Sequence, residues 1–321
     1  DMNRIFSDYY SKNLPPERQK EVSHRYVCGL YRCMKELTNR FPDILFEGCA
    51  AGGNRFDLGM LCYFPQIWAS DNTDALCRAQ IQYNYSYGYP LSCISAHVSA
   101  SPNHQTLRNM PLESRFAVAA FGLLGYECNM CDMNKEELNA VKCQIELYKK
   151  LRNVFFTGTF YRTESFEEEN AGNASVLNNG KGNRAEWTVV STDKKKAVGL
   201  IMQKHVIPNT QYACYRAKGL DEAKKYHFYN RKLQYDIKEF GELVNMVSPI
   251  HIKQGSMLQD ILSKKMDGET EDYIAYGDTL MYSGVRLKQA FSATGYNENV
   301  RFFQDFAARL YFMEEVEDDK Q

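Results

Sequence analysis

Two aspartates in one short polar segment are the first candidates for chemistry in this sequence. The segment Ser-Asp-Asn-Thr-Asp begins at Ser70 and directly follows the apolar residues 67–69, which are predicted to form a strand. Aspartates at such a position, here Asp71 and Asp74, can act as a general acid or a general base. The structural alternative is that Asp71 or Thr73 caps the helix predicted to follow. The residues alone leave both interpretations open.

A loop with two consecutive glycines is the second candidate. It has the sequence Cys-Ala-Ala-Gly-Gly-Asn-Arg over residues 49–55 and follows a strand predicted at residues 44–46. Consecutive glycines allow a tight turn and expose backbone N–H groups to a bound ligand. The loop matches neither of the phosphate-binding patterns GxxxxGKS/T and GxGxxG. A thiol nucleophile formed by Cys49 with His97 or His104 is less favoured, because the sequence does not fix the distance between them.

The elements around these two segments alternate between short apolar runs and amphipathic stretches. Predicted strands start near residues 44, 67, 91 and 126, which gives intervals of 23, 24 and 35 residues. Predicted helices occupy residues 22–37, 55–62, 73–85, 111–124 and 135–151. Alternation at this spacing indicates parallel strands joined by right-handed crossovers. The polar segments would then lie at the carboxyl edge of the sheet, in a (β/α) barrel or in a doubly wound open sheet.

From about residue 155 the pattern changes to short alternating segments separated by turn-rich stretches. Alternation of apolar and polar residues predicts antiparallel strands, arranged as a sandwich. These strands are predicted at residues 158–162, 186–191, 198–205 and 211–217. Residues 235–246 form a helical or mixed stretch. Residues 314–320, with five acids and one base, are predicted to be a solvated tail.

Composition excludes several classes of protein. The 321 residues are 44% hydrophobic and 25% charged, which is the balance of a soluble protein with a sizeable core. Thirty-nine basic and forty acidic residues give a net charge of −1, so binding to nucleic acid or to an acidic membrane is not expected. The longest nearly apolar run, residues 116–126, is far shorter than the ~20 residues of a membrane span.

The ten cysteines indicate free thiols rather than disulfides or a metal site. Most of them fall in apolar, periodic segments, which predicts that they are buried in a protein of a reducing compartment. A cytoplasmic location is therefore expected. The single pair Cys128-Asn-Met-Cys131 lacks the second pair that a zinc site requires, so we expect no metal and no cofactor.

Five segments of the sequence, taken in order, carry a resemblance to a known family. They are Asp1-Met2-Asn3-Arg4, Phe46 to Met60, Trp68 to Ala75, His97 to Thr106 and Gly125 to Glu127. Together these segments closely resemble the α-galactosidases of glycoside hydrolase family thirty-six. Lys218-Gly-Leu-Asp221 is similar to a segment of that family's terminal domain, so the resemblance covers essentially the whole chain.

The resemblance implies the fold class, which is α/β plus all-β. Family members have a large N-terminal β-supersandwich, a (β/α)8 TIM barrel that carries catalysis, and a C-terminal antiparallel β-sandwich. This chain is expected to contain strands four to eight of the barrel in residues 1–153 and the C-terminal sandwich in residues 154–321. The supersandwich and the first barrel strands are absent from the sequence, so it is expected to be a fragment.

The resemblance also implies a pair of catalytic carboxylates. Asp1 matches the aspartate that is the family's nucleophile, and Asp71 matches the acid/base in its Ser-Asp-x-Thr-Asp motif. A retaining glycosidase needs two such carboxyl groups about 5–5.5 Å apart. Asp1 would attack the anomeric carbon to form a covalent galactosyl-enzyme, while Asp71 would protonate the leaving oxygen and then deprotonate water. Asp74 keeps the role of a helix cap or of a residue that supports the site.

Three further residues are implied to contact the galactose. Asn3 matches the asparagine of the family's nucleophile motif. Cys49 and Gly52 match its Cys-Ala-Ser-Gly-Gly loop, in which Ala51 replaces the serine. The implied substrates are oligosaccharides with terminal α-galactosyl groups, of the melibiose and raffinose type. Family members are often homotetramers, so a homo-oligomer is expected.

Three alternatives remain beside an α-galactosidase. A galactosyltransferase of the raffinose or stachyose synthase type uses the same pair of carboxylates, and an α-N-acetylgalactosaminidase would differ only in its substrate loops. The third alternative is a non-catalytic truncated fragment. A half barrel exposes two sheet edges, and a nucleophile at a chain terminus such as Asp1 is poorly held.

Overall fold

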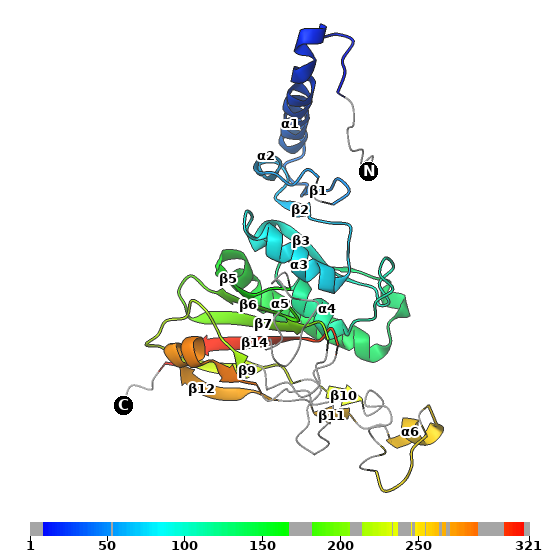
Figure 1. The fold of residues 1–321 in the computed structure, drawn as a ribbon, viewed down its shortest axis with the longest axis vertical. Coiled ribbons are helices and arrows are strands. Elements are labelled where there is room, and N and C mark those ends of the chain that lie inside the picture. The colour runs from blue at the N-terminus through cyan, green and yellow to red at the C-terminus, as the bar shows by residue number, and fades with distance from the viewer. Residues whose placement is uncertain are drawn as a thin grey trace. The chain divides into compact units, whose positions relative to one another are not determined.

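The computed structural model describes residues 9–52, 54–166, 182–205, 214–232, 234–236, 245, 248–253, 255–262, 265–267, 270–287 and 305–317. The chain divides into two compact units, Asp1–Gly158 and Thr159–Gln321. Figure 1 shows the helices and strands in chain order. The first unit holds a parallel sheet and the second an antiparallel one. The predicted α/β plus all-β fold class is confirmed.

A parallel sheet of four strands organises the first unit. In sheet order, the strands are β1 (Glu47–Gly48), β2 (Gln66–Trp68), β3 (Ile94–Ser99) and β4 (Leu123–Glu127). Neighbours in the sheet are also successive in the chain, as in part of a (β/α) barrel. Strands β1, β3 and β4 start three residues away from the predicted positions 44, 91 and 126. Their registers follow from the pairing of Glu47 with Gln66 and of Ser95 with Leu123.

Helices alternate with these strands in the predicted order. They are α1 (Val22–Arg40), α2 (Leu58–Leu61), α3 (Ala75–Tyr85), α4 (Leu112–Ala119) and α5 (Lys135–Thr157). Short 3-10 helices are η1 (Pro16–Glu21), η2 (Leu91–Cys93) and η3 (Met130–Asp132). Side-chain caps fix where three of them begin: Asp57 for α2, Asp74 for α3 and Asn134 for α5. The boundary predicted between residues 153 and 154 lies inside α5.

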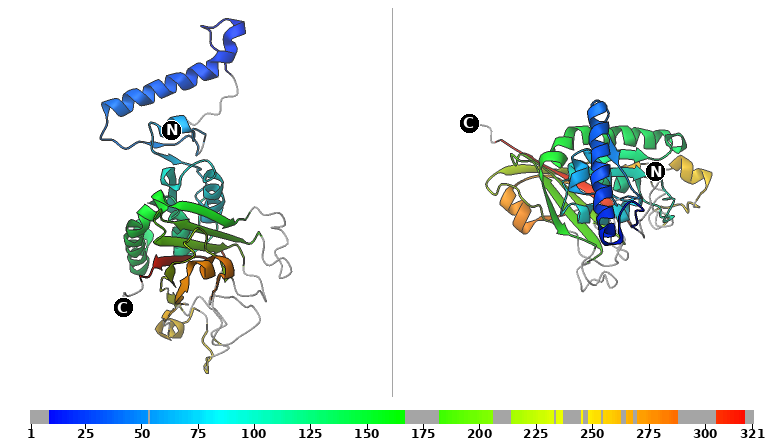
Figure 2. Two further views of the ribbon diagram at one scale, coloured as in Figure 1. Left: turned by 90° about the vertical axis from the view of Figure 1, so that its left-hand side faces the viewer. Right: turned by 90° about the horizontal axis from the view of Figure 1, so that it is seen from above.

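The two faces of the parallel sheet differ in chemistry, because side chains alternate along each strand. On one face, Ile67 and Ile94 join an apolar cluster against which Leu30 and Met34 of α1 pack. Helix α1 itself has no buried residue and projects from the sheet (Figure 1 and Figure 2). On the other face, β3 carries polar side chains, which are those of Ser95, His97 and Ser99. This polar face leads to the carboxyl edge of the sheet.

A six-stranded antiparallel sheet organises the second unit. In sheet order, its strands are β12 (Asp272–Tyr276), β9 (Lys225–Asn230), β14 (Ala308–Glu315), β7 (Lys196–Gln203), β6 (Arg184–Val190) and β5 (Thr159–Glu164). The remaining described elements are the paired strands β8 (Cys214–Tyr215) with β13 (Val285–Arg286) and β10 (Gln234–Asp236) with β11 (Lys265–Asp267), and the helices α6 (Met257–Leu262) and η7 (Thr279–Ser283). The antiparallel strands predicted near 158, 186 and 198 are confirmed. Of residues 211–217 and 235–246, the structure describes only 214–217, 235–236 and 245.

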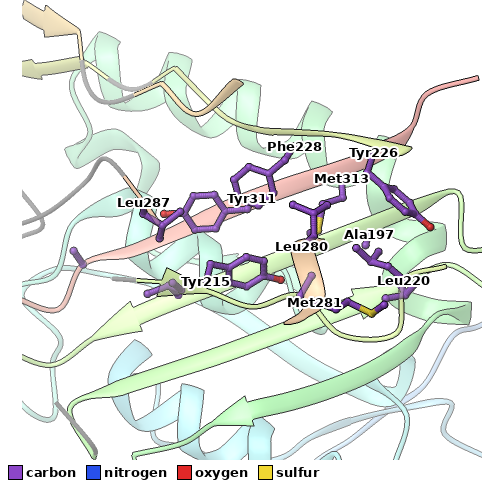
Figure 3. Packing of buried hydrophobic residues seen from close by; sticks show 14 residues of the cluster. Ala197, Tyr215, Leu220, Tyr226, Phe228, Leu280, Met281, Leu287, Tyr311 and Met313 are labelled. Carbon is purple, nitrogen blue, oxygen red and sulfur yellow. The ribbon is translucent and has the colours of Figure 1, made fainter. Parts of the chain in front are cut away.

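The core of the second unit is aromatic and lies on one face of this sheet. Figure 3 shows Tyr215 of β8 beside Tyr311 of β14, and their rings stack with centroids 5.5 Å apart. Phe228 of β9 stacks on the same Tyr311 at 5.4 Å. Leu280 of η7 joins this cluster, so the β8–β13 pair and η7 form the layer that covers the sheet.

The prediction of a solvated tail at residues 314–320 is wrong for its first two residues. Glu314 and Glu315 end β14, which lies between β7 and β9. Glu314 forms an ion pair with Lys196 at 3.4 Å, and Glu315 forms one with Lys224 at 3.1 Å. The two glutamates are therefore the last residues of an interior strand. The run of acidic residues begins at the end of that strand, so it does not mark the start of a tail.

The prediction of buried thiols is wrong for all but one cysteine. All ten are free, as predicted, but only Cys93 is buried. Six are exposed, among them Cys28 and Cys33 on α1, because the apolar periodicity of α1 does not bury any of its residues. In the part of the chain that the structure describes, no helix combines the length and the apolar character needed to cross a membrane.

Candidate active site

The two polar segments singled out in the sequence meet at the carboxyl edge of the parallel sheet. Gly52 has a φ of +81°, a conformation that favours glycine. A Cβ added at Gly52 would lie 2.5 Å from the Ser70 Cα atom and 3.0 Å from the Asp71 backbone nitrogen. The loop after β1 therefore touches the backbone that carries Asp71, and only a glycine fits at that contact.

Backbone turns and one arginine shape the loop after β1. The Ala50 N–H donates to the Gly52 carbonyl at 3.2 Å, and Ala51 also has a positive φ, of 47°. The Arg55 guanidinium donates to the Cys49 carbonyl at 2.5 Å. The Cys49 side chain is exposed. The loop thus presents the thiol of Cys49 to solvent while Gly52 is buried against the next segment.

The segment after β2 is held in place at nearly every residue. The Ser70 hydroxyl accepts the Asn72 N–H at 3.1 Å, and the Asn72 side chain accepts the Asp74 N–H at 3.1 Å. The Thr73 hydroxyl accepts the Asn103 amide at 2.9 Å, and the Ser99 hydroxyl donates to the Thr73 carbonyl at 2.9 Å. Asn103 is therefore part of the scaffold of this segment.

Asp74 is the helix cap of this segment. Its carboxylate is fully buried and accepts the Leu76 N–H at 2.9 Å, which fixes the start of α3. The same carboxylate accepts the Thr106 hydroxyl at 2.6 Å and pairs with Arg108 at 2.6 Å. Burial acts to raise the pKa of Asp74, but these hydrogen bonds and the charge of Arg108 outweigh it and hold the pKa below its ordinary value.

Asp71 stands apart from its neighbours. It is exposed, and it makes no hydrogen bond or ion pair with any of the residues that the structure describes. The cap that the sequence allowed for Asp71 or Thr73 is formed by Asp74 instead. The arrangement therefore presents one carboxylate, on an immobilised backbone, beside the Cys49–Gly52 loop.

An aromatic and charged layer lies on the polar face of the sheet. The Trp68 side chain is buried, stacks on the His97 ring with centroids 4.4 Å apart, and has the Arg78 guanidinium 4.6 Å from its ring. His97 contacts Glu127 at 3.1 Å. A Cβ added at Gly125 would lie 2.5 Å from the His97 ring, so the glycine leaves room for it. Trp68 is therefore a core residue of this unit.

Two groups in this layer were not predicted from the sequence. Arg78 lies on α3 and is almost completely buried, although an arginine in a helix pattern is normally assigned to its exposed face. Glu47 of β1 accepts hydrogen bonds from Ser95 and, at 2.6 Å, from Gln66. The alternation of side chains along the strands could have predicted that Gln66 and Ser95 lie on the same face of the sheet. It could not have predicted that Ser95 contacts Glu47 across β2.

Two of the predicted site residues, Asp1 and Asn3, lie outside the described residues. The thiol–histidine alternative gains no support, since none of the described contacts joins Cys49 to His97 or His104. Within the described ranges, no group of three or more His, Cys, Asp or Glu side chains could hold a metal ion.

Two models of known protein families match this chain. Residues 1–158 match the model of the Melibiase family, and residues 184–313 match the model of the glycosyl hydrolase family 36 C-terminal domain. The chain belongs to glycoside hydrolase family thirty-six. Within this family, the chain is 45% identical over 226 residues to α-galactosidase AgaA of Geobacillus stearothermophilus, a match that covers 70% of this chain and 29% of that protein. It is 44% identical over 228 residues to α-galactosidase Mel36A of Lactobacillus acidophilus, which covers 70% of this chain and 29% of that protein.

Solved structures of family thirty-six proteins share the fold of the chain. The α-galactosidase of Lactobacillus brevis matches with a TM-score of 0.73 and 34% identity, over 97% of this chain and 34% of that one. A variant of AgaA in complex with raffinose matches with a TM-score of 0.71 and 36% identity, over 95% of this chain and 33% of that one. The chain thus spans about a third of the length of the relatives that it matches. 

Proposed function

We propose that the full-length protein is a retaining α-galactosidase and that Asp71 is its general acid/base. The observation that carries this proposal is the contrast within residues 70–74. Four of these residues are held by hydrogen bonds, whereas Asp71 is exposed on the backbone that they immobilise. A group that donates a proton must reach the substrate from a fixed position, and this arrangement meets both needs.

The relatives support an oligosaccharide substrate. Variants of AgaA from Geobacillus stearothermophilus have been crystallised in complex with raffinose and in complex with stachyose, and both match this chain at 36% identity. We extend the proposal to terminal α-galactosyl groups of such oligosaccharides. Cys49 and Gly52, in the loop that touches the Asp71 backbone, and Asn3 would contact the galactose.

The proposed mechanism has two inverting steps. The Asp1 carboxylate attacks the anomeric carbon and displaces the leaving alcohol, whose oxygen takes its proton from Asp71. Water, deprotonated by the Asp71 carboxylate, then attacks the same carbon and releases galactose and Asp1. Galactose leaves with the anomeric configuration of the substrate. 

Removal of the Asp71 carboxyl group tests the acid/base role. In Asp71→Gly, kcat/KM for raffinose should fall by about 10³-fold, because its sugar leaving group needs a proton. The fall for 4-nitrophenyl α-galactoside should be much smaller, since nitrophenolate leaves without protonation. Added azide should react with the galactosyl-enzyme of Asp71→Gly and give α-galactosyl azide, the retained product, identified by NMR.

The matched control is Asp43→Asn, which changes an exposed aspartate that precedes β1 at the opposite edge of the sheet. It should keep both rates. Equal losses on the two substrates in Asp71→Gly, with no azide product, would reject the acid/base assignment. An absence of α-galactosidase activity in the unaltered protein, with the protein folded by circular dichroism, would reject the function itself.

A further inference from the structure

A buried arginine lies directly beneath the segment that carries Asp71. Arg78 projects from the first turn of α3 and is 1% exposed. Its guanidinium donates to the Ser70 carbonyl at 3.2 Å and to the Ser95 carbonyl at 2.5 Å. One side chain therefore ties together the residue that precedes Asp71 and the neighbouring strand.

The two carbonyls mark the point at which β2 separates from β3. The register of these parallel strands pairs Ile67 with Ile94 and Trp68 with Ser95, and β2 ends there. Strand β3 continues and pairs with β4 as far as Ser99. Beyond the last paired residues of β2 and β3, the Arg78 guanidinium thus supplies the hydrogen bonds that the strand ladder no longer provides. It thereby fixes the direction in which Ser70 leaves the sheet.

The position is costly for a charged group. In the part of the chain that the structure describes, Arg78 forms no salt bridge, and its Nε has no hydrogen-bond partner. Burial lowers its pKa to about 10, so it still carries its charge at neutral pH. A buried charge without a paired counter-charge destabilises a fold relative to an apolar side chain of similar size. The Trp68 ring, 4.6 Å from the guanidinium, offsets part of this cost, and the Ser70 and Ser95 carbonyls bind two of its donors.

We propose that Arg78 is a positioning residue for the acid/base Asp71. Ser70 is held from two sides: Arg78 binds its carbonyl, and Gly52 lies against its Cα atom, where an added Cβ would come within 2.5 Å. Asp71 is the next residue in the chain, so these two contacts fix the backbone from which its carboxylate extends. The inference rests on the proposed function, because it assigns Arg78 a part in the reaction of that site.

A second buried arginine offers a matched control. Arg115 of α4 donates to the Met110 carbonyl at 3.1 Å and to the Ser99 carbonyl. It resembles Arg78 in burial and in binding carbonyls at the end of a strand. It lies one strand further along, however, and none of its described hydrogen bonds reaches residues 70–74. The substitution of either arginine by lysine keeps the charge and loses the forked pair of donors.

The experiment compares Arg78→Lys with Arg115→Lys in the full-length protein, on raffinose and on 4-nitrophenyl α-galactoside. If Arg78 positions Asp71, kcat/KM for raffinose should fall at least about tenfold more than kcat/KM for the nitrophenyl substrate, since only raffinose depends on a well-placed proton donor. Arg115→Lys should change both values by the same factor. Arg78→Gln, which retains one amide donor, provides a second variant if the lysine variant fails to fold by circular dichroism.

An equal fall on both substrates in the folded Arg78 variants would overturn the inference and leave Arg78 with a purely structural role. Asp71→Gly separates this outcome from failure of the proposed function. If Asp71→Gly shows the dependence on the leaving group and the Arg78 variants do not, only the positioning role is wrong. If Asp71→Gly does not show the dependence on the leaving group either, the acid/base assignment is wrong, and so is the inference that rests on it.

Discussion

The two units each contain a buried polar cluster, and the clusters differ in what they leave exposed. At the carboxyl edge of the parallel sheet, Arg78 and its neighbours bind backbone groups, while the Asp71 carboxylate is exposed. In the antiparallel unit, the Glu186 carboxylate is itself enclosed, with its side chain 2% exposed. It lies 3.9 Å from Arg184 and accepts the Arg216 N–H at 3.0 Å.

This difference separates a reactive group from a structural one. Both clusters contain an acid near an arginine, so residue type alone does not identify a site. A carboxylate can act on an external substrate only if it is accessible while its backbone is fixed. Asp71 meets this condition, and Glu186 does not. Substitutions in the two clusters should accordingly affect different quantities, activity in the first and stability in the second.

After removal of the Asp71 carboxyl group itself, the largest loss of activity is expected for Gly52→Ala. The new Cβ would meet the Ser70 Cα atom at 2.5 Å, and the φ of +81° strains any residue with a side chain. The segment that carries Asp71 must therefore shift, and kcat/KM for raffinose should fall by about 10²-fold, the effect of a displacement of about 1 Å. Steady-state kinetics of the full-length protein measure this.

Gly88→Ala is the control for this substitution. A Cβ at Gly88 meets no atom within 4 Å, and its φ is not positive, so activity should be unchanged. A Gly52→Ala enzyme with normal kcat/KM would contradict the contact between the two loops.

The largest loss of stability is expected for Asp74→Ala. This substitution removes the cap of α3 and leaves Arg108 without the carboxylate that it contacts at 2.6 Å. The loss of free energy of unfolding should be about 3 kcal/mol, because a buried pair and a cap are broken together. Asp74→Asn keeps an acceptor for the cap and should lose less. Urea unfolding followed by Trp68 fluorescence reports on this unit.

The pH dependence provides an internal check on Asp74. Its pKa is lowered in the folded protein, so its contribution to stability is complete above the ordinary value of 3.8 and is lost as the pH falls through the folded value. Asp74→Ala should therefore differ most from the unaltered protein at neutral pH, and the difference should shrink in acid. A difference that is constant with pH would show that the charge of Asp74 contributes nothing.

Local patterns predicted the helices well and the strands less well. Helix α3 begins where Asp74 precedes an amphipathic stretch, and both signals lie within a few residues of each other. Strand β1 is different, since the apolar run 44–46 satisfies the pattern of a strand, but the actual strand is set by the pairing of Glu47 with Gln66. Strand β14 was missed because its two partners are distant in sequence and its last residues are acidic.

In the candidate site, too, local patterns predicted some features, whereas others depend on the folded structure. The polar segments after β1 and β2 were found from residue type and their position after apolar runs. Which aspartate caps α3 and which remains exposed was not fixed by the residues alone, because Asp71, Thr73 and Asp74 are all good caps. Arg78 was missed for a different reason. Its role depends on burial and on the end of the β2–β3 ladder, neither of which a helical pattern encodes.

The smallest effect on activity is expected for Glu186→Gln, in the enclosed cluster. Burial raises the pKa of Glu186 to about 7 from an ordinary value of 4.5, and the charge of Arg184 offsets this only in part. Between pH 4.5 and 7 the folded protein keeps a proton that the unfolded chain has lost. The free energy of unfolding should therefore fall by about 3 kcal/mol as the pH rises through this range. Glutamine mimics the protonated form, so the variant should lack this fall.

Urea unfolding at pH 5 and pH 8, followed by the fluorescence of the adjacent Trp187, measures the effect in this unit. The unaltered protein and Glu186→Gln should agree at pH 5, and the variant should be the more stable at pH 8. Glu317→Gln, at an exposed position of the same unit, should keep the pH dependence of the unaltered protein. A variant that is destabilised equally at both values would mean that Glu186 is ionised in the fold. The comparison between an accessible acid, Asp71, and an enclosed neutral acid, Glu186, would then be wrong for Glu186.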